Sequence, residues 1–157
     1  MRRIVSVGLV VLATASCASG KEPVHGDRGN RILVLIRTAG GTIELDDLDV
    51  ALTPDDQARG LMGRTSLRQD GGMAFLFESE TTAAFWMKDT LIPLSILFWR
   101  ADGRIIDILD MRPCRSDPCP VYRASGPYVG AIEMNRGTFE RLGVKIGDTL
   151  EYRLLSE

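Results

Sequence analysis

The sequence predicts a mainly β fold, a small barrel-like or curled antiparallel sheet with two short helices. Short apolar and β-branched runs recur along the chain, and Gly, Pro and Asp turn signals separate them roughly every eight to twelve residues, a pattern typical of such sheets. Only two stretches carry helix signals. The 157 residues, of which 45% are hydrophobic and 25% charged, are enough for one domain with a core.

The first 17 residues predict an export signal. Arg2 and Arg3 precede an apolar run over residues 4–13 that is too short to span a bilayer. Residues 13–15 fit a signal-peptidase site, which would give free secretion. Residues 15–17 fit the end of a lipobox, although Thr14 stands where a lipobox usually has Leu. We favour acylated Cys17 as a membrane anchor and expect the protein on the periplasmic face of the cell envelope.

Residues 18–29 read as a polar linker, and residues 30–157 as a single β-rich domain. The linker contains three Gly or Pro residues beyond Lys21 and the only histidine of the chain, His25. A single histidine in such a tether is expected to face solvent and to carry no chemistry.

The strands are predicted from apolar runs and the turns between them. Gly40-Gly41 predicts a two-residue hairpin turn, and Asp102-Gly103 gives the strongest hairpin signal in the chain. Residues 96–99 are apolar on both faces, so their strand is expected to be central. A loop is expected over residues 78–82. The strands are expected over residues 31–38, 42–45, 48–52, 73–77, 94–100, 104–111, 129–134 and 149–155.

Both helices are predicted to be short. Thr53 suits the N-cap, Pro54 the first helical position, and the two following aspartates complement the helix dipole. This helix is expected to run to about Met62 and to stop at Gly63. The second is one helical turn over residues 138–142, ended by Gly143.

Two cysteines remain after the signal, Cys114 and Cys119, in a proline-rich loop. In an oxidising compartment a disulfide is the natural interpretation. A redox pair or half of a metal site are the alternatives, but the spacing is not C-x-x-C and no second cysteine pair or nearby histidine is present.

Several chemistries are excluded by the residues that the domain lacks. Without a histidine there is no Ser-His-Asp or Cys-His machinery and no histidine-based zinc site. Gly71-Gly72 lacks the lysine of a phosphate loop and predicts only a turn. The formal net charge is −2 and no basic run interleaves with aromatic residues, so nucleic acid is not an expected partner. No cofactor and no metal are predicted.

The central part of the chain resembles a bacterial and archaeal family known as domain of unknown function 192. The matching residues cover about residues 45–153, and their order and spacing carry the resemblance rather than any single piece. The resemblance implies a compact, mostly β domain that is often exported and has no established activity. Family members typically carry an acidic residue after Pro-Leu, whereas this chain has Ser95. The matching pieces are Arg59-Gly-Leu-Met, Arg64, Gly72-Met73-x-Phe75, Phe85-Trp-Met-Lys88, Pro93-Leu94, Asp102-Gly103, the Pro-Cys…Cys-Pro-x-Tyr122 loop, Ile132-Glu133 and Gly147-Asp148.

The favoured hypothesis is a non-enzymatic module of the cell envelope that binds a small ligand or serves as an accessory to an envelope protein. Aromatic residues such as Trp86 can stack on a sugar or another small molecule, and cationic side chains can fix an anionic group. If Glu133 is buried, we expect it to pair with Arg59 or Arg64. The candidate ligand-binding residues are Arg59, Met62, Arg64, Trp86, Lys88 and Glu133. For each, packing or a solvated charged rim is the alternative interpretation.

Two alternative functions stay open. A carboxylate-dependent hydrolase would use an Asp/Glu pair, with Asp89 and Glu133 among the candidates, as acid and base. A copper-handling protein would use thioether sulfurs as soft ligands for Cu(I). Methionine also fills irregular gaps in a core, so the methionines have a structural interpretation too. The five methionines of the domain are Met62, Met73, Met87, Met111 and Met134.

Overall fold

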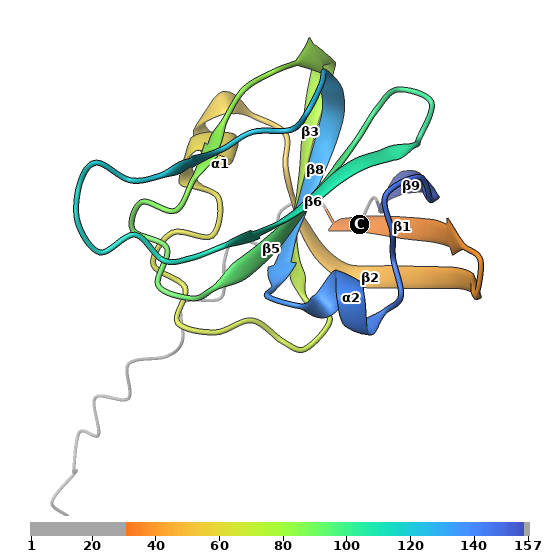
Figure 1. Ribbon diagram of the computed structural model, residues 1–157, viewed down its shortest axis with the longest axis horizontal. Coiled ribbons are helices and arrows are strands. Elements are labelled where there is room, and N and C mark those ends of the chain that lie inside the picture. Colours follow the sequence, from red (N-terminus) through yellow and green to blue (C-terminus); the bar gives the residue numbers. More distant parts are fainter. Residues whose placement is uncertain (1–30, 156–157) are drawn as a thin grey trace, which may run out of the picture.

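The computed structural model describes residues 31–155 as one curled seven-stranded sheet, a two-stranded ribbon and two short helices (Figure 1). The predicted signal peptide, linker and lipidation site at Cys17 lie outside the described residues. The large sheet has the order β6-β5-β8-β3-β2-β1-β9, and β4 pairs with β7. Its strands are β1 (Arg31–Thr38), β2 (Gly41–Ala51), β3 (Gly72–Thr81), β5 (Leu94–Trp99), β6 (Ile105–Met111), β8 (Tyr128–Asn135) and β9 (Thr149–Leu155); the ribbon is β4 (Phe85–Trp86) and β7 (Val121–Tyr122), and the helices are α1 (Pro54–Arg59) and α2 (Thr138–Arg141).

The prediction of a mainly β, curled sheet with two short helices is confirmed, but the expectation of a purely antiparallel sheet is wrong. The sheet is mixed, because β2 and β3 run parallel, with Leu48 opposite Gly72. It is also not a closed barrel. The edge strands β6 and β9 meet only at one corner, where Ile105 donates to the Asp148 carbonyl at 2.9 Å and Leu150 donates to the Gly103 carbonyl at 2.8 Å. Beyond that corner the two edges form no ladder within residues 31–155.

Two apolar clusters occupy the two faces of the sheet. The first is lined by alternate residues of β1 such as Ile32, Val34 and Ile36, with Trp99 and Phe139. The second lies between the other face and the segments that carry α1, β4 and β7 (Figure 1). It contains Ala51, Leu61, Met73, Phe75, Met87, Leu94, Ile96, Phe98, Met111, Tyr128 and Ala131.

The central strand β5 is buried along its whole length between β6 and β8, as its apolar run predicts. Successive side chains of a strand point to opposite faces, so Phe98 enters the second cluster and Trp99 the first. The Trp99 ring lies directly over Gly130 of β8. A Cβ at position 130 would stand 2.2 Å from the indole Cζ2, which explains why β8 has glycine there.

Several element boundaries differ from the predicted ones. Helix α1 ends at Arg59 rather than Met62, because Gly60 adopts a positive φ of 46° and breaks the helix. Strand β3 continues to Thr81 through the predicted loop at residues 78–82. The turn of the β1–β2 hairpin lies one residue earlier than predicted, since Thr38 pairs with Gly41. Thr53 caps α1 as predicted and accepts from the Asp56 N–H.

We expect Gly130→Ala to lower the free energy of unfolding by about 1–3 kcal/mol, the range typical of overpacking a filled core. The added methyl group has to displace the buried Trp99 ring. Urea denaturation followed by tryptophan fluorescence measures the change. Gly126→Ala is the matched control, because no atom lies within 4 Å of a Cβ built at residue 126. Equal stabilities of the two variants would contradict the packing argument.

Candidate ligand-binding face

One row of side chains crosses four strands on the face of the second cluster. Asp49 of β2 lies opposite Met73 of β3, Met73 opposite Glu133 of β8, and Glu133 opposite Ile96 of β5. Residues directly opposite each other project to the same face of a sheet. Glu133 therefore lies between two apolar neighbours, Met73 and Ile96, which both belong to the second cluster.

Glu133 is buried without a protein partner. The residue is 4% exposed, and its carboxyl forms no hydrogen bond or ion pair with any residue in 31–155. In this range, every side-chain nitrogen or oxygen that is fully enclosed has a hydrogen-bond partner. The Glu133 oxygens are thus not fully enclosed by protein atoms. Burial raises the pKa of this carboxyl from an ordinary 4.5 to about 8.

The expected pairing of Glu133 with Arg59 or Arg64 is wrong. Arg64 instead donates to the Asp49 carboxylate at 2.6 Å. Asp49 is at the end of the row, and Met73 separates it from Glu133. Arg59 is the last residue of α1, and its side chain is exposed.

The segments that carry the other candidates are connected to one another by main-chain hydrogen bonds. Gly63 donates to the Asp89 carbonyl at 2.8 Å, which joins the segment with Met62 and Arg64 to the segment with Trp86 and Lys88. Asp89 has a positive φ of 53°, an uncommon conformation that aspartate tolerates better than most residues. The two motif segments are therefore held next to each other above the second cluster.

Trp86 and Lys88 lie next to each other, and the Trp86 ring is exposed. The Trp86 side chain is 48% exposed, and the Lys88 ammonium lies 5.6 Å from the centre of its ring, within the range of a cation–π contact. Val121, directly opposite Trp86 in the ribbon, is 57% exposed. An exposed aromatic ring beside a cation is suited to stack on a ring that carries negative charge.

The predicted disulfide is confirmed, because Cys114 and Cys119 are bonded. The bridged loop leads into β7, which pairs with β4 through Phe85 and Tyr122. Cys114 also donates to the Met87 carbonyl at 3.4 Å. The disulfide loop is in this way attached to the strand that presents Trp86.

The methionines do not form one group. Met73, Met87 and Met111 belong to the second cluster, and the last two are completely buried. Met134 lies on the opposite face in the first cluster, and Met62 is half-buried beside α1. Their environment is apolar and aromatic, as expected of methionines that fill a core.

Ser95 lies on the other face from Glu133. Its hydroxyl donates to the Asp110 carboxylate at 2.6 Å and accepts from the Gly137 N–H at 2.9 Å. Arg136 donates to the same carboxylate at 2.9 Å. The Ser95 hydroxyl and then the Arg136 guanidinium hold the pKa of Asp110 below its ordinary value. The neighbouring strand thus supplies a carboxylate beside the position where relatives have an acidic residue.

Sequence reasoning missed Asp49 and Val121. Asp49 lies in a β2 run in which acidic and apolar residues alternate, and only the parallel pairing with β3 brings it into the row. Val121 lies in a two-residue strand that is too short for a periodic signal. Within residues 31–155, no group of three or more His, Cys, Asp or Glu residues is arranged to hold a metal ion.

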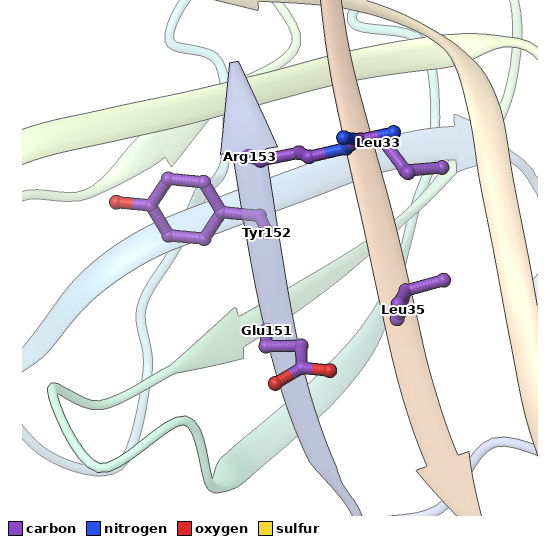
Figure 2. Close-up of a pocket in the computed structure, with 5 residues that line it drawn as sticks. All are labelled: Leu33, Leu35, Glu151, Tyr152 and Arg153. Atoms are coloured by element: carbon purple, nitrogen blue, oxygen red, sulfur yellow. The ribbon is translucent and has the colours of Figure 1, made fainter. Parts of the chain in front are cut away.

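A separate shallow cavity of about 180 Å³ lies on the outer face of β1 and β9. Figure 2 shows Leu33 and Leu35 of β1 beside Glu151 and Arg153 of β9, with the Tyr152 ring projecting away from β1. None of the predicted site residues lines this cavity.

Within residues 31–155, no helix has the length and apolar character needed to cross a membrane.

Comparison with known proteins identifies the family. The model of DUF192, described as "Uncharacterized ACR", matches residues 35–152, and the chain belongs to this family. No functionally curated protein matches the chain.

Two solved structures share the fold. One is a proposed transcription regulator of Sinorhizobium meliloti 1021, 35% identical, with a TM-score of 0.73 over 81% of this chain and 98% of that one. The other is a protein of unknown function from Novosphingobium aromaticivorans DSM 12444, 34% identical, with a TM-score of 0.73 over 92% and 99% of the two chains. The resemblance noted in the sequence is thus confirmed, and neither relative's description specifies a ligand.

We expect the stability of the protein to fall as the pH rises from about 5 to 8, by up to about 1.4 kcal/mol per pH unit. The raised pKa means that the folded state keeps the Glu133 proton in this window while the unfolded state loses it. Glu133→Gln removes this contribution, so the variant should match the wild type near pH 5 and exceed it near pH 8. Urea denaturation across the pH range measures both.

Glu44→Gln is the control for this experiment, because Glu44 is exposed on β2. It should keep the pH dependence of the wild type. A wild-type protein with equal stability at pH 5 and pH 8 would show that Glu133 is not buried as an unpaired carboxyl.

Reduction of the disulfide should cost about 2 kcal/mol, the loop entropy expected for so short a closed loop. Because the loop is attached to Met87 and to β4, amide exchange over residues 85–90 should speed up more than exchange in β5. Urea denaturation and hydrogen exchange with and without reductant measure the two effects. A Cys114→Ser, Cys119→Ser variant should resemble the reduced protein and ignore the reductant; a response of that variant would point to another target.

Proposed function

We propose that this DUF192 domain is a non-enzymatic binding module on the periplasmic face of the cell envelope, anchored by acylated Cys17. Its ligand is a small anionic ring compound, such as an acidic or phosphorylated sugar. The observation that carries the proposal is the Glu133 carboxyl, which is buried and has no protein partner within residues 31–155. A buried polar group without a partner is costly, and a ligand that hydrogen-bonds with it recovers that cost.

The chemistry around Glu133 favours an anionic ligand. With its pKa raised to about 8, Glu133 is mostly protonated at neutral pH and can donate a hydrogen bond instead of repelling negative charge. Lys88 lies beside the exposed Trp86 ring, which offers a stacking surface and a cation together. Arg59, which precedes the Gly63 that bonds to Asp89, is exposed and supplies a further positive charge, whereas Arg64 is paired with Asp49.

The alternative functions receive less support. A hydrolase would need Asp49 and Glu133 as its carboxylate pair, since both lie in one row. Arg64 already holds the Asp49 carboxylate in an ion pair at 2.6 Å, so this carboxylate is not free to act as acid or base. A copper site is not favoured, because Met87 and Met111 are fully enclosed by apolar neighbours. The net charge of −2 also does not favour the nucleic-acid role that the name of the S. meliloti relative would suggest.

A thermal-shift panel tests the proposal. The full oxidised chain is heated with neutral sugars, acidic and phosphorylated sugars, nucleotides, peptidoglycan fragments and metal ions. A ligand that binds only the folded state stabilises it by about 2.7 kcal/mol at 100 times its dissociation constant. We expect shifts from the acidic or phosphorylated sugars, lost in Trp86→Ala and reduced in Lys88→Ala and Glu133→Gln.

Leu91→Ala is the matched control for Trp86→Ala. Leu91 is also an exposed apolar residue, 58% exposed, and both substitutions leave an alanine. It should leave the shift unchanged. A flat panel, or a shift that survives Trp86→Ala, contradicts the proposal. Turnover of a panel compound that disappears in Glu133→Gln would replace it with the hydrolase function.

A further inference from the structure

The edge strand β9 exposes main-chain groups that can pair with another strand. Strand β9 pairs with β1 on one side. On its opposite side, the residues from Glu151 onward form no pairing within residues 31–155. Residues along a strand alternate in the direction of their N–H and C=O groups. The Leu150 N–H points away from β1 to Gly103, so those of Tyr152 and Leu154 point away from β1 as well. Tyr152 and Leu154 thus offer unpaired main-chain donors and acceptors.

The same two residues carry an apolar row beyond the edge of the core. Leu150, Tyr152 and Leu154 lie opposite Ile36, Val34 and Ile32 of β1, all completely buried. Leu150 is 6% exposed, but Tyr152 is 45% and Leu154 47% exposed. The Tyr152 ring still contacts Trp99, with ring centres 6.0 Å apart. The apolar surface is therefore continuous with the first cluster and is exposed at β9.

We propose that β9 pairs with β9 of a second copy of this chain, antiparallel and about a two-fold axis at Arg153. The Leu150 N–H is already bonded to the Gly103 carbonyl. This register therefore uses only the unpaired edge groups of Tyr152 and Leu154. Tyr152 of each copy then lies opposite Leu154 of the other. Each exposed apolar side chain is covered by the partner's, and each edge residue is hydrogen-bonded in both directions.

Charges on the outer face are balanced in this arrangement. The two Arg153 side chains lie opposite each other at the axis, which is unfavourable alone. Each Arg153 also lies diagonal to Glu151 of the other copy, so the two positive charges are flanked by two negative ones. Glu151 keeps its ion pair with Arg37 at 2.7 Å, which holds it on this face. A long edge strand with exposed apolar residues and no proline is otherwise a liability that proteins usually block.

Sedimentation velocity tests the pairing on the full chain with Cys17→Ala, which removes the proposed acylation site and leaves the edge intact. We expect a concentration-dependent dimer. Tyr152→Pro should raise its dissociation constant at least about tenfold, because proline deletes the Tyr152 edge N–H. Hydrogen exchange at Tyr152 and Leu154 should slow as the concentration rises. A wild-type chain that stays monomeric at its highest soluble concentration overturns the proposal.

Two further variants distinguish the β9 edge from other surfaces. Tyr152→Ala keeps the N–H and removes the ring, so it should weaken the dimer less than Tyr152→Pro. Ile146→Ala removes another exposed apolar residue, 60% exposed and just before β9, and should leave the dimer unchanged. A dimer that is insensitive to Tyr152→Pro, or equally sensitive to Ile146→Ala, overturns the assignment to this edge. Urea denaturation of each variant confirms that it folds. The outcome is independent of ligand binding at Glu133.

Discussion

Strand β8 is the element on which the rest of the structure depends. It pairs with β3 on one side and β5 on the other, and these two pairings join the β5–β6 hairpin to the β1, β2, β3 and β9 part of the sheet. Its glycine at position 130 admits the Trp99 ring, and its alternate residues serve both clusters. Glu133 therefore sits on a strand that is paired on both sides.

An unpaired carboxyl in such a place is a cost that packing alone does not explain. Replacing it with an apolar residue of similar size would remove the desolvation penalty. The nearest arginine of the motif pairs with Asp49 instead, so the charge that would neutralise Glu133 is present on the face but committed elsewhere. The surrounding segments are at the same time tied together through Gly63, Asp89, Met87 and Cys114. These bonds hold the motif segments together against the second cluster.

Much of the fold could be predicted from local signals, while the geometry of the site could not. The Asp102-Gly103 turn, the Thr53 cap and the buried β5 run are local and were predicted correctly. The β2–β3 parallel pair and the β4–β7 ribbon depend on contacts far apart in the sequence, so periodicity gives no sign of them. For this reason Trp86 and Glu133 could be selected as candidates by residue type, but the partner of Arg64 could not. The length of α1 was overestimated because Gly60 and Gly63 are equally good stops by composition.

The parallel β2–β3 pair has a consequence for how this family can change over evolutionary time. Parallel neighbours need a crossover of about a dozen residues or more, and here residues 52–71 make it, with α1, Met62 and Arg64 on the way. Because the two strand ends are fixed, the crossover cannot be deleted. It can be lengthened, since closure entropy grows only slowly with loop length. Insertions in this crossover are therefore tolerated more readily than its deletion, while the sheet stays the same.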